Sequence, residues 1–116
     1  MDEGFPTARL VATASVVRAG APLPLELEVS NQTDEALRDA MAEVTLEVER
    51  GVLVTWHLSL REVAAGEHAR DAVRTSEPGW TLPLNVSSGL GHFRVVLLSA
   101  DGAWLSEHEL VLPVEA

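Results

Sequence analysis

The sequence has no cysteine, no lysine, no isoleucine and no tyrosine. Without cysteine there is no disulfide framework, no thiol nucleophile and no thiolate-ligated metal. An apolar core must therefore stabilise the chain, and 47% hydrophobic and 22% charged residues in 116 positions are sufficient for one. No tandem repeat, low-complexity tract or Gly/Ser linker interrupts the chain, so we predict a single domain over residues 1–116.

Positive charge is also scarce. All eight basic residues are arginine, and 18 acidic residues bring the formal net charge to −10. Such a surface repels phosphate backbones and anionic lipids, so we expect no nucleic-acid partner. The same charge favours solubility and a basic partner. The missing residue types, together with abundant Ala, Val, Leu and Arg, are typical of GC-rich bacterial genomes and indicate a bacterial source.

Long apolar runs are missing as well. The longest spans four residues, Val95 to Leu98, whereas a membrane-spanning helix needs about 20. We therefore expect no membrane insertion. The first ten residues, MDEGFPTARL, are acidic and lack an apolar stretch, so we expect no signal peptide there. Two locations stay open: a cytoplasmic protein, or a domain cut from a longer exported bacterial chain.

The dominant pattern in the sequence is an alternation of apolar and polar residues, which is typical of half-buried strands. It is clearest in PLPLELEVS, residues 22–30. Because Pro24 has no amide proton, strand pairing should begin after it. The same alternation marks residues 42–49 and 52–60, and Arg50-Gly51 between them predicts a turn.

Further segments extend this pattern. HFRVVLLSA, residues 92–100, is apolar on both faces toward its end, which predicts a strand inside a sheet. Asp101-Gly102 then supplies the positive-φ residues of a tight hairpin turn. The other expected strands are 8–17, a weaker one after Gly66 within 64–76, a short edge strand at 81–86 and a last one at 103–114. Residues 32–41 predict either a short helix or a polar loop.

No long helical pattern lies between these strands to connect them in parallel. Antiparallel sheets follow, and two facing sheets bury one apolar face each. We therefore predict an all-β fold, an immunoglobulin-like antiparallel β-sandwich of about seven to eight strands. The Cys–Trp–Cys pattern of antibody domains is absent, so the prediction rests on strand number and alternation.

Three stretches carry a family resemblance. RAGAPLPLELEVSNQTDEAL places a glycine turn before an alternating strand that stops at an asparagine, LREVAAGEHARDAV holds a mid-domain turn, and GHFRVVLLSADGAWLSE is a closing hairpin. Together they resemble the bacterial cell-adhesion-related domain and fibronectin type III-like modules. The resemblance implies a binding or spacer module without catalysis. The C-terminal polysaccharide-binding domains of O-antigen ABC transporters share a comparable layout.

Glu107, His108 and Glu109 form the cluster that most resembles a chemical site. Successive side chains of a strand point to opposite faces, so the two glutamates share one face and His108 points to the other. They cannot converge on one ion unless a bulge intervenes, and we expect a solvated strand face. The even-numbered residues look like the core face: Trp104, Ser106, His108, Leu110, Leu112 and Val114. His108 is then a hydrogen-bonded, half-buried histidine, unless a bulge near Ser106 resets the faces.

Other candidate sites receive structural interpretations. His57, His68 and His92 lie on different segments, and nothing in their spacing predicts a metal site. Asp34, Glu35 and Asp39 offer oxygen ligands without the spacing of a calcium loop, so helix capping is preferred. The sequons at Asn31 and Asn85 are interpreted as turns. Because the sequence has no Gly-x-Ser-x-Gly elbow, P-loop or dinucleotide fingerprint, we expect no catalytic residue, no cofactor and no enzyme.

The three tryptophans are the best candidates for binding. Trp56 and Trp104 fall on patterned strands, so we expect them in the core. Trp80 follows Pro78-Gly79 and is the candidate binding residue, stacking on a sugar or anchoring a protein, unless it folds back over the core. We expect a non-enzymatic interaction or assembly module that binds a protein partner or self-associates through a strand edge. The alternative is a carbohydrate-binding accessory domain of a larger system.

Overall fold

The computed structural model describes residues 5–48, 52–73, 82 and 88–115, with the side chains of residues 52 and 53 excepted. Within these residues the fold is all-β and contains no helix. The strands are β1 (Thr7–Ala12), β2 (Val17–Arg18), β3 (Leu25–Ser30), β4 (Met41–Val48), β5 (Val52–Ser59), β6 (His68–Ala69), β7 (Gly89–Leu98) and β8 (Trp104–Glu115). No helix among the described residues is long and apolar enough to cross a membrane.

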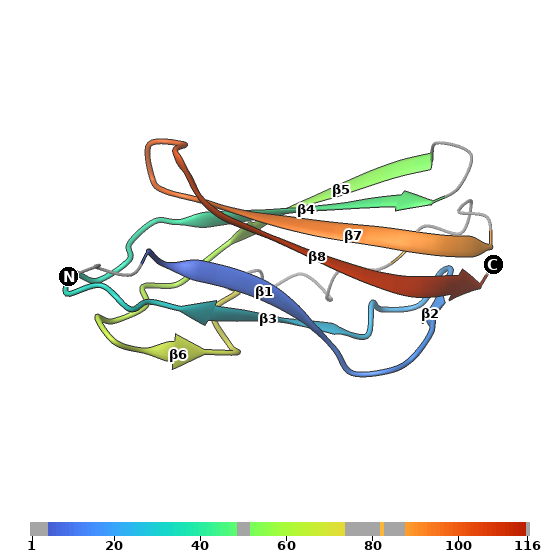
Figure 1. Cartoon of the computed structure of the whole chain (residues 1–116), viewed down its shortest axis with the longest axis horizontal. Coiled ribbons are helices and arrows are strands. Elements are labelled where there is room, and N and C mark those ends of the chain that lie inside the picture. Colours follow the sequence, from blue (N-terminus) through green and yellow to red (C-terminus); the bar gives the residue numbers. More distant parts are fainter. Residues whose placement is uncertain (1–4, 49–51, 74–81, 83–87, 116) are drawn as a thin grey trace.

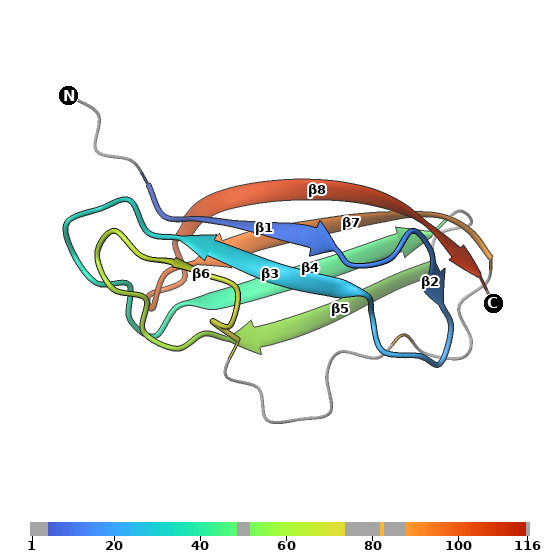
Figure 2. The ribbon, with the colours of Figure 1, turned by 90° about the horizontal axis from the view of Figure 1, so that it is seen from below.

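The strands form two sheets that face each other. One sheet has three strands in the order β1-β3-β6, and the other has five in the order β2-β8-β7-β4-β5. Figures 1 and 2 show β1 and β3 lying over β8, β7 and β4. Neighbouring strands are antiparallel except for β2 and β8, which are parallel. The expected interior position of the strand at 92–100 is confirmed, because β7 lies between β4 and β8.

The apolar alternation explains which residues enter the space between the sheets. In β3, Leu25, Leu27 and Val29 are buried while Glu26 is exposed, as predicted from the sequence. The strand begins directly after Pro24, because proline cannot donate to the ladder. The inward residues of all the long strands form one continuous apolar cluster. The core therefore lies between the two sheets.

Phe93 has the greatest volume among the fully buried side chains, and it points inward from the middle of β7. Two residues before it, Gly91 leaves room for the core. A Cβ atom at Gly91 would lie 2.8 Å from Val114 Cγ2 and 2.9 Å from Leu46 Cδ1. These separations are too short for carbon contacts, so a glycine is needed where β7 passes these two side chains.

A bulge in β8 changes the direction of one tryptophan. Leu97 pairs with Ser106 while Leu98 pairs with Trp104, so Leu105 is an extra residue in the ladder. An extra residue reverses the alternation beyond it. The even-numbered residues from Ser106 onward face the core as expected, but Trp104 is 63% exposed. The expectation that Trp104 lies in the core is therefore wrong.

Residues 32–40 form a loop and Met41 begins β4, so the loop alternative for residues 32–41 is found rather than the helix. Side chains at its start occupy a carbonyl that a helix would use as an acceptor. Asn31 Nδ2 and Thr33 Oγ1 both donate to the carbonyl of Glu35, at 2.9 Å each. Such side-chain bonds compete with helix formation. A positive φ of 55° at Asp39 also departs from helical geometry.

Several expected strands are shorter than predicted. The segment 8–17 is divided between β1 and β2, and only His68–Ala69 is a strand within the described part of 64–76. The turn at Gly66 is confirmed by its φ of 78°, whereas in Asp101-Gly102 only the glycine has a positive φ, of 87°. The expected turn at Arg50-Gly51 lies outside the described residues, as does most of the strand at 81–86.

Candidate functional site

The structure separates the Glu107–His108–Glu109 triplet onto two faces. Both glutamates are exposed, while His108 is half-buried and points toward β1. There its Nδ1 accepts a hydrogen bond from the amide of Leu10 at 3.2 Å. The expectation of a hydrogen-bonded, inward-facing histidine is confirmed. The bulge near Ser106 is also present, but it redirects Trp104 rather than His108.

His108 belongs to a seam between the two sheets. Ser106 Oγ on the same strand accepts from the amide of Ala8 at 3.2 Å. β1 is an edge strand of the three-stranded sheet, and Ala8 and Leu10 donate from the side away from β3. Edge amides left without acceptors invite pairing with another chain. The two side chains of β8 close this edge, which is a structural role.

Replacing His108 with alanine should lower the free energy of unfolding by about 1–2 kcal/mol, because the Leu10 amide loses its acceptor. Urea unfolding of the purified chain measures the difference. His57→Ala is the matched control, since His57 is exposed and its contact with Glu43 is 3.7 Å long. The control should change stability by less than about 0.5 kcal/mol. If His108→Ala and His57→Ala change the free energy of unfolding equally, the hydrogen bond between His108 and β1 does not stabilise the fold.

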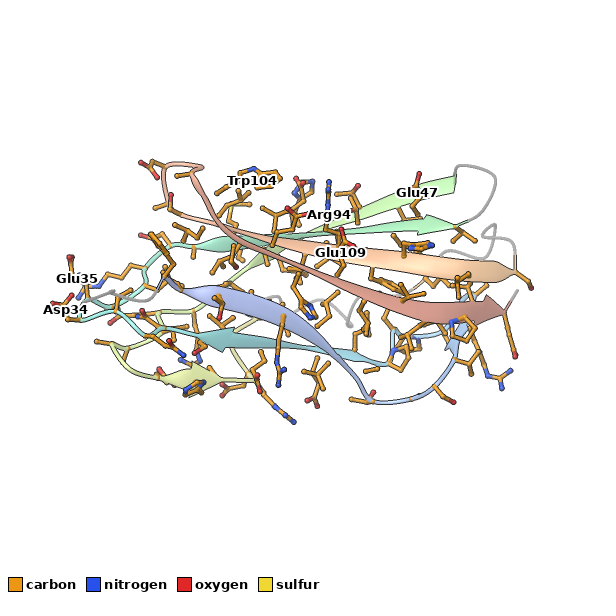
Figure 3. All side chains as sticks on the ribbon, viewed as in Figure 1. Asp34, Glu35, Glu47, Arg94, Trp104 and Glu109 are labelled. Carbon is orange, nitrogen blue, oxygen red and sulfur yellow. The ribbon has the colours of Figure 1, made fainter. Side chains whose placement is uncertain are left out.

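The remaining candidate ligands do not converge. His57, His68 and His92 lie on β5, β6 and β7. Asp34 and Glu35 are exposed on the loop, and Figure 3 shows them at the opposite end of the molecule from Glu47. Among the described residues, no group of three histidine or carboxylate side chains can hold a metal ion.

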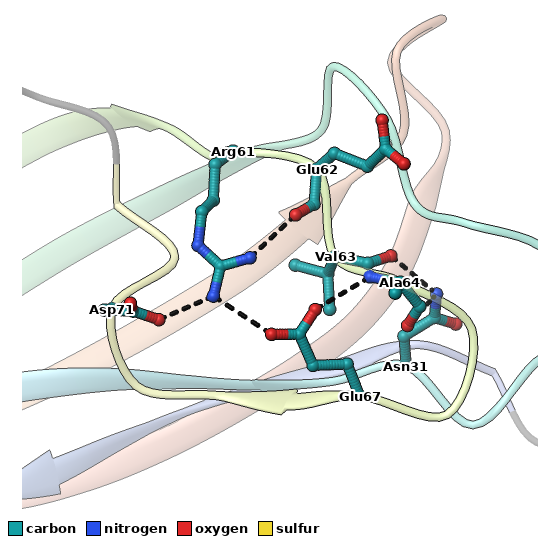
Figure 4. Close-up of polar contacts among 7 residues, drawn as sticks. All are labelled: Asn31, Arg61, Glu62, Val63, Ala64, Glu67 and Asp71. Carbon is teal, nitrogen blue, oxygen red and sulfur yellow. Dashed lines mark hydrogen bonds and ion pairs between the residues drawn. The ribbon is translucent and has the colours of Figure 1, made fainter.

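Arg61 organises a cluster of polar side chains around the turn at Gly66 (Figure 4). Its guanidinium donates to Glu67 at 3.1 Å, to Asp71 at 2.6 Å and to the carbonyl of Glu62 at 2.8 Å. Glu67 also accepts from the amide of Ala64 at 2.9 Å, which ties down the turn at Gly66. The hydrogen bond from Arg61 lowers the pKa of both Glu67 and Asp71. The cluster supports this turn.

Acid should weaken the fold in part through this cluster. Since the folded pKa of Glu67 lies below its usual value of 4.5, its stabilisation is fully present above that value and is lost as pH falls through the lowered pKa. Urea unfolding between about pH 6 and about pH 2 should show a flatter acid dependence for Glu67→Gln than for the parent chain. Arg61→Gln should flatten the acid dependence at least as much, because the lowered pKa of Asp71 also depends on Arg61, and adding Glu67→Gln to it should change little. A Glu67→Gln variant with the parent's pH dependence would refute this cause.

The structure distributes the three tryptophans differently from the expectation. Trp80 lies outside the described residues, so its candidate role stays a prediction. Trp56 is half-buried and packs against the core. Trp104 is 63% exposed on the surface of the five-stranded sheet that points away from the three-stranded sheet, here called the outer face. Sequence reasoning missed this residue because strand parity does not reveal a bulge.

The end of the outer face near Trp104 is apolar. Met41, Leu98 and Trp104 occupy one cross-strand row on β4, β7 and β8. Met41 is 40% exposed, and Leu98 is half-buried. Val96 points to the same face, since its neighbours on β7 point to the core, and it is nevertheless buried. These four residues form the apolar end of the outer face.

A shallow basin of about 400 Å³ lies farther along the outer face. Figure 3 shows Trp104, Arg94 and Glu47 on the same side of the sheet. Arg94 forms an ion pair with Glu107 at 3.3 Å. The basin is lined by Thr45, Glu47, His92, Phe93, Arg94 and Glu109. The exposed Trp104 and this charged hollow thus share the outer face, although Trp104 does not line the hollow.

No protein-family model matches the chain, and no curated protein matches it. Solved structures share its fold. The CARDB domain of the PF1109 protein from Pyrococcus furiosus, solved in complex with di-metal ions, superimposes with a TM-score of 0.59 and 17% identity. The match covers 95% of this chain and 89% of that domain. At this identity the likeness shows the fold alone.

Two other similar structures belong to longer chains. The alkylpurine DNA glycosylase AlkC of Pseudomonas fluorescens, bound to DNA with an abasic-site analog, matches with a TM-score of 0.57 and 12% identity. The sporulation control protein Spo0M of Bacillus subtilis matches with a TM-score of 0.57 and 15% identity. Each match covers 97% of this chain, but only 31% of the glycosylase and 50% of Spo0M. The same fold thus occurs as one part of larger proteins.

Proposed function

We propose that this chain is an immunoglobulin-like β-sandwich that serves as a non-enzymatic interaction module, and that it binds a protein through its outer face. The observation that carries the proposal is Trp104, 63% exposed in a row with Met41 and Leu98. Exposed apolar clusters with a polar surround mark interaction sites, and tryptophan is enriched among residues that dominate binding energy.

Two further observations support this proposal. The CARDB fold resemblance is to a domain of the cell-adhesion-related class, which favours a binding module over an enzyme. Among the described residues no group of three histidine or carboxylate side chains could hold a metal ion, and His108 is engaged with the main chain of β1. The pairing with another chain through a strand edge stays a prediction. For it we propose β5, an edge strand of the five-stranded sheet that contains no proline, aspartate, glutamate, lysine or arginine.

Binding of a carbohydrate is the second candidate function, and one observation favours it. Trp104 stands on the same face as a basin lined by hydroxyl, carboxylate, imidazole and guanidinium groups. An aromatic surface beside a few polar groups is the usual composition of a small-ligand site. In an oligosaccharide, one ring would stack on Trp104, and the polar groups of the basin would bind the hydroxyls of a further ring.

One experiment distinguishes the two candidates. The full chain is selected against a phage-displayed library of random peptides and, separately, applied to an array of oligosaccharides. We expect peptides whose affinity falls at least about tenfold with Trp104→Ala, while the stability of the chain changes by less than about 0.5 kcal/mol. Phe5→Ala is the matched control, because Phe5 is 73% exposed and lines a different hollow.

The outcomes separate cleanly. Oligosaccharides that require Trp104, with no such peptides, would replace the first candidate with the second. If neither a peptide nor an oligosaccharide depends on Trp104 for binding, the outer face is refuted as a binding site. Equal losses for Trp104→Ala and Phe5→Ala would show that exposed aromatic side chains promote nonspecific adhesion.

A further inference from the structure

We infer that the occupant of the outer face is a basic protein segment, which places an apolar side chain on Trp104 and arginine or lysine side chains over the neighbouring carboxylates. This inference rests on the proposed function and adds the chemistry of the partner. Three observations support it: the excess of carboxylates on the outer face, the order of apolar and acidic rows along the strands, and the poorer fit of other occupants.

The central part of the outer face has an excess of negative charge. It carries four carboxylates, of Glu43, Glu47, Glu107 and Glu109, and one guanidinium, of Arg94. Glu107 is paired with Arg94 at 3.3 Å, and Glu43 lies 3.7 Å from the ring of His57. Glu47 and Glu109 form no ion pair with any other described residue, and both are exposed. These two carboxylates have room for an incoming cation.

The strand register places the negative charges in order behind the apolar end. The row next to Met41, Leu98 and Trp104 contains Glu43 and Glu107. The following row contains Glu109, and the one after it contains Glu47. Same-face residues of one strand are about 7 Å apart, so the carboxylates lie within about 7–20 Å of the apolar row. A single extended segment of about seven residues can span that distance.

A partner of this composition matches both parts of the face. An apolar side chain buries the exposed surface of Trp104, which is the main gain expected at the centre of an interface. Cationic side chains around it meet the free carboxylates of Glu47 and Glu109. Charge complementarity of this kind raises the association rate and rejects partners of the wrong sign.

Other occupants fit less well. A second copy docked on the same face would oppose two surfaces that each carry uncompensated negative charge, and like charges across an interface cost free energy. Nucleic acids and anionic lipids are also negative, and the chain carries a net charge of −10. A neutral glycan can use Trp104 and can donate hydroxyl hydrogen bonds to Glu47 and Glu109, but it leaves their negative charge uncompensated.

The test compares two double variants, each of which replaces two carboxylates with neutral amides. Glu47→Gln/Glu109→Gln removes the free carboxylates of the outer face. Asp34→Asn/Glu35→Gln changes the net charge equally, but on the distant loop. Peptides selected on the full chain through Trp104 are titrated by calorimetry against the parent chain and both variants, at about 0.05 M and about 0.5 M salt.

We expect the selected peptides to combine an apolar residue with neighbouring arginine or lysine. Their affinity should fall at least about tenfold with the outer-face variant, stay within about twofold with the loop variant, and weaken at high salt. Trp104-dependent peptides that are neutral or acidic, or equal losses with both variants, would overturn the basic partner while the interaction function stands. If sedimentation shows a dimer that dissociates in the Trp104→Ala variant, the occupant is a second copy of the chain, and the basic partner is overturned as well. Failure to select any Trp104-dependent peptide would overturn both proposals.

Discussion

Asn31→Ala is expected to lower the free energy of unfolding by about 3–5 kcal/mol, although Asn31 lies in a polar loop outside the apolar core. The side chain is completely buried. Its Nδ2 donates to the carbonyls of Glu35, Val63 and Ala64 at 2.9–3.2 Å. Each of these carbonyls keeps a second donor, from Leu37, Glu67 or Thr33, so truncation removes bonds rather than leaving the acceptors unpaired. At about 0.5–1.5 kcal/mol for each lost bond, these three bonds and the two that Asn31 Oδ1 accepts from Thr33 account for the expected loss. Urea unfolding followed by tryptophan fluorescence measures the loss.

Asn31 is the connection between two loops that are distant in sequence. Its amide donates to the carbonyl of Glu67, and its carbonyl accepts from the amide of Gly66 at 2.7 Å. Its side chain also accepts from the hydroxyl of Thr33 at 2.7 Å. The residue therefore joins the end of β3 to the turn at Gly66 and to the start of the loop that follows β3.

Two variants test this role further. Asn31→Asp keeps the size of the side chain and its acceptor, but it removes both donors and places a charge beside three carbonyl oxygens. It should destabilise at least as much as alanine. Gln32→Ala is the control, because Gln32 is exposed and makes one bond of 3.5 Å, and it should cost less than about 0.5 kcal/mol. A native-like stability of Asn31→Asp would exclude the donor role.

Phe93→Ala is expected to lower the free energy of unfolding by about 3–5 kcal/mol through loss of apolar burial and creation of a cavity. Phe93 is fully buried, and its register neighbours are Leu46 on β4 and Leu110 on β8. Both flanking strands are held in long ladders, so the space cannot close easily. Small domains have a total stability of about 5–15 kcal/mol, so this loss is large. Thermal and urea unfolding measure it.

Phe93→Leu separates the cavity from the loss of an aromatic ring. Leucine fills most of the volume and should cost less than about half of the alanine effect. Val111→Ala is a surface control on the adjacent strand, where the side chain is 47% exposed. If Phe93→Ala and Val111→Ala cost the same, the core is not centred where β7 passes between its neighbours.

Much of the fold could be predicted from the sequence because alternation is a local property. Residues 22–30 show this well: every second side chain is apolar, and those residues are buried in β3. Parity also gave the correct answer for Glu107, His108 and Glu109. In each case the strand has one face that must be covered, and the direction of each side chain follows from its position alone.

The candidate site could not be predicted in the same way. Trp104 belongs to the core-facing set by parity, and one extra residue in the ladder turns it outward. The partners of Asn31 at residues 63 and 64 come from a loop more than thirty positions away. The row of Met41, Leu98 and Trp104 joins three strands whose relative register is not written in any one of them.

Local alternation and composition are sufficient to predict the all-β class, the buried face of most strands and the strongly negative charge of the surface. They do not predict which strands are neighbours, where the bulge of β8 lies or which carboxylates share a face with Trp104. Pairing between distant strands sets the register, and the register assigns side chains to a common surface.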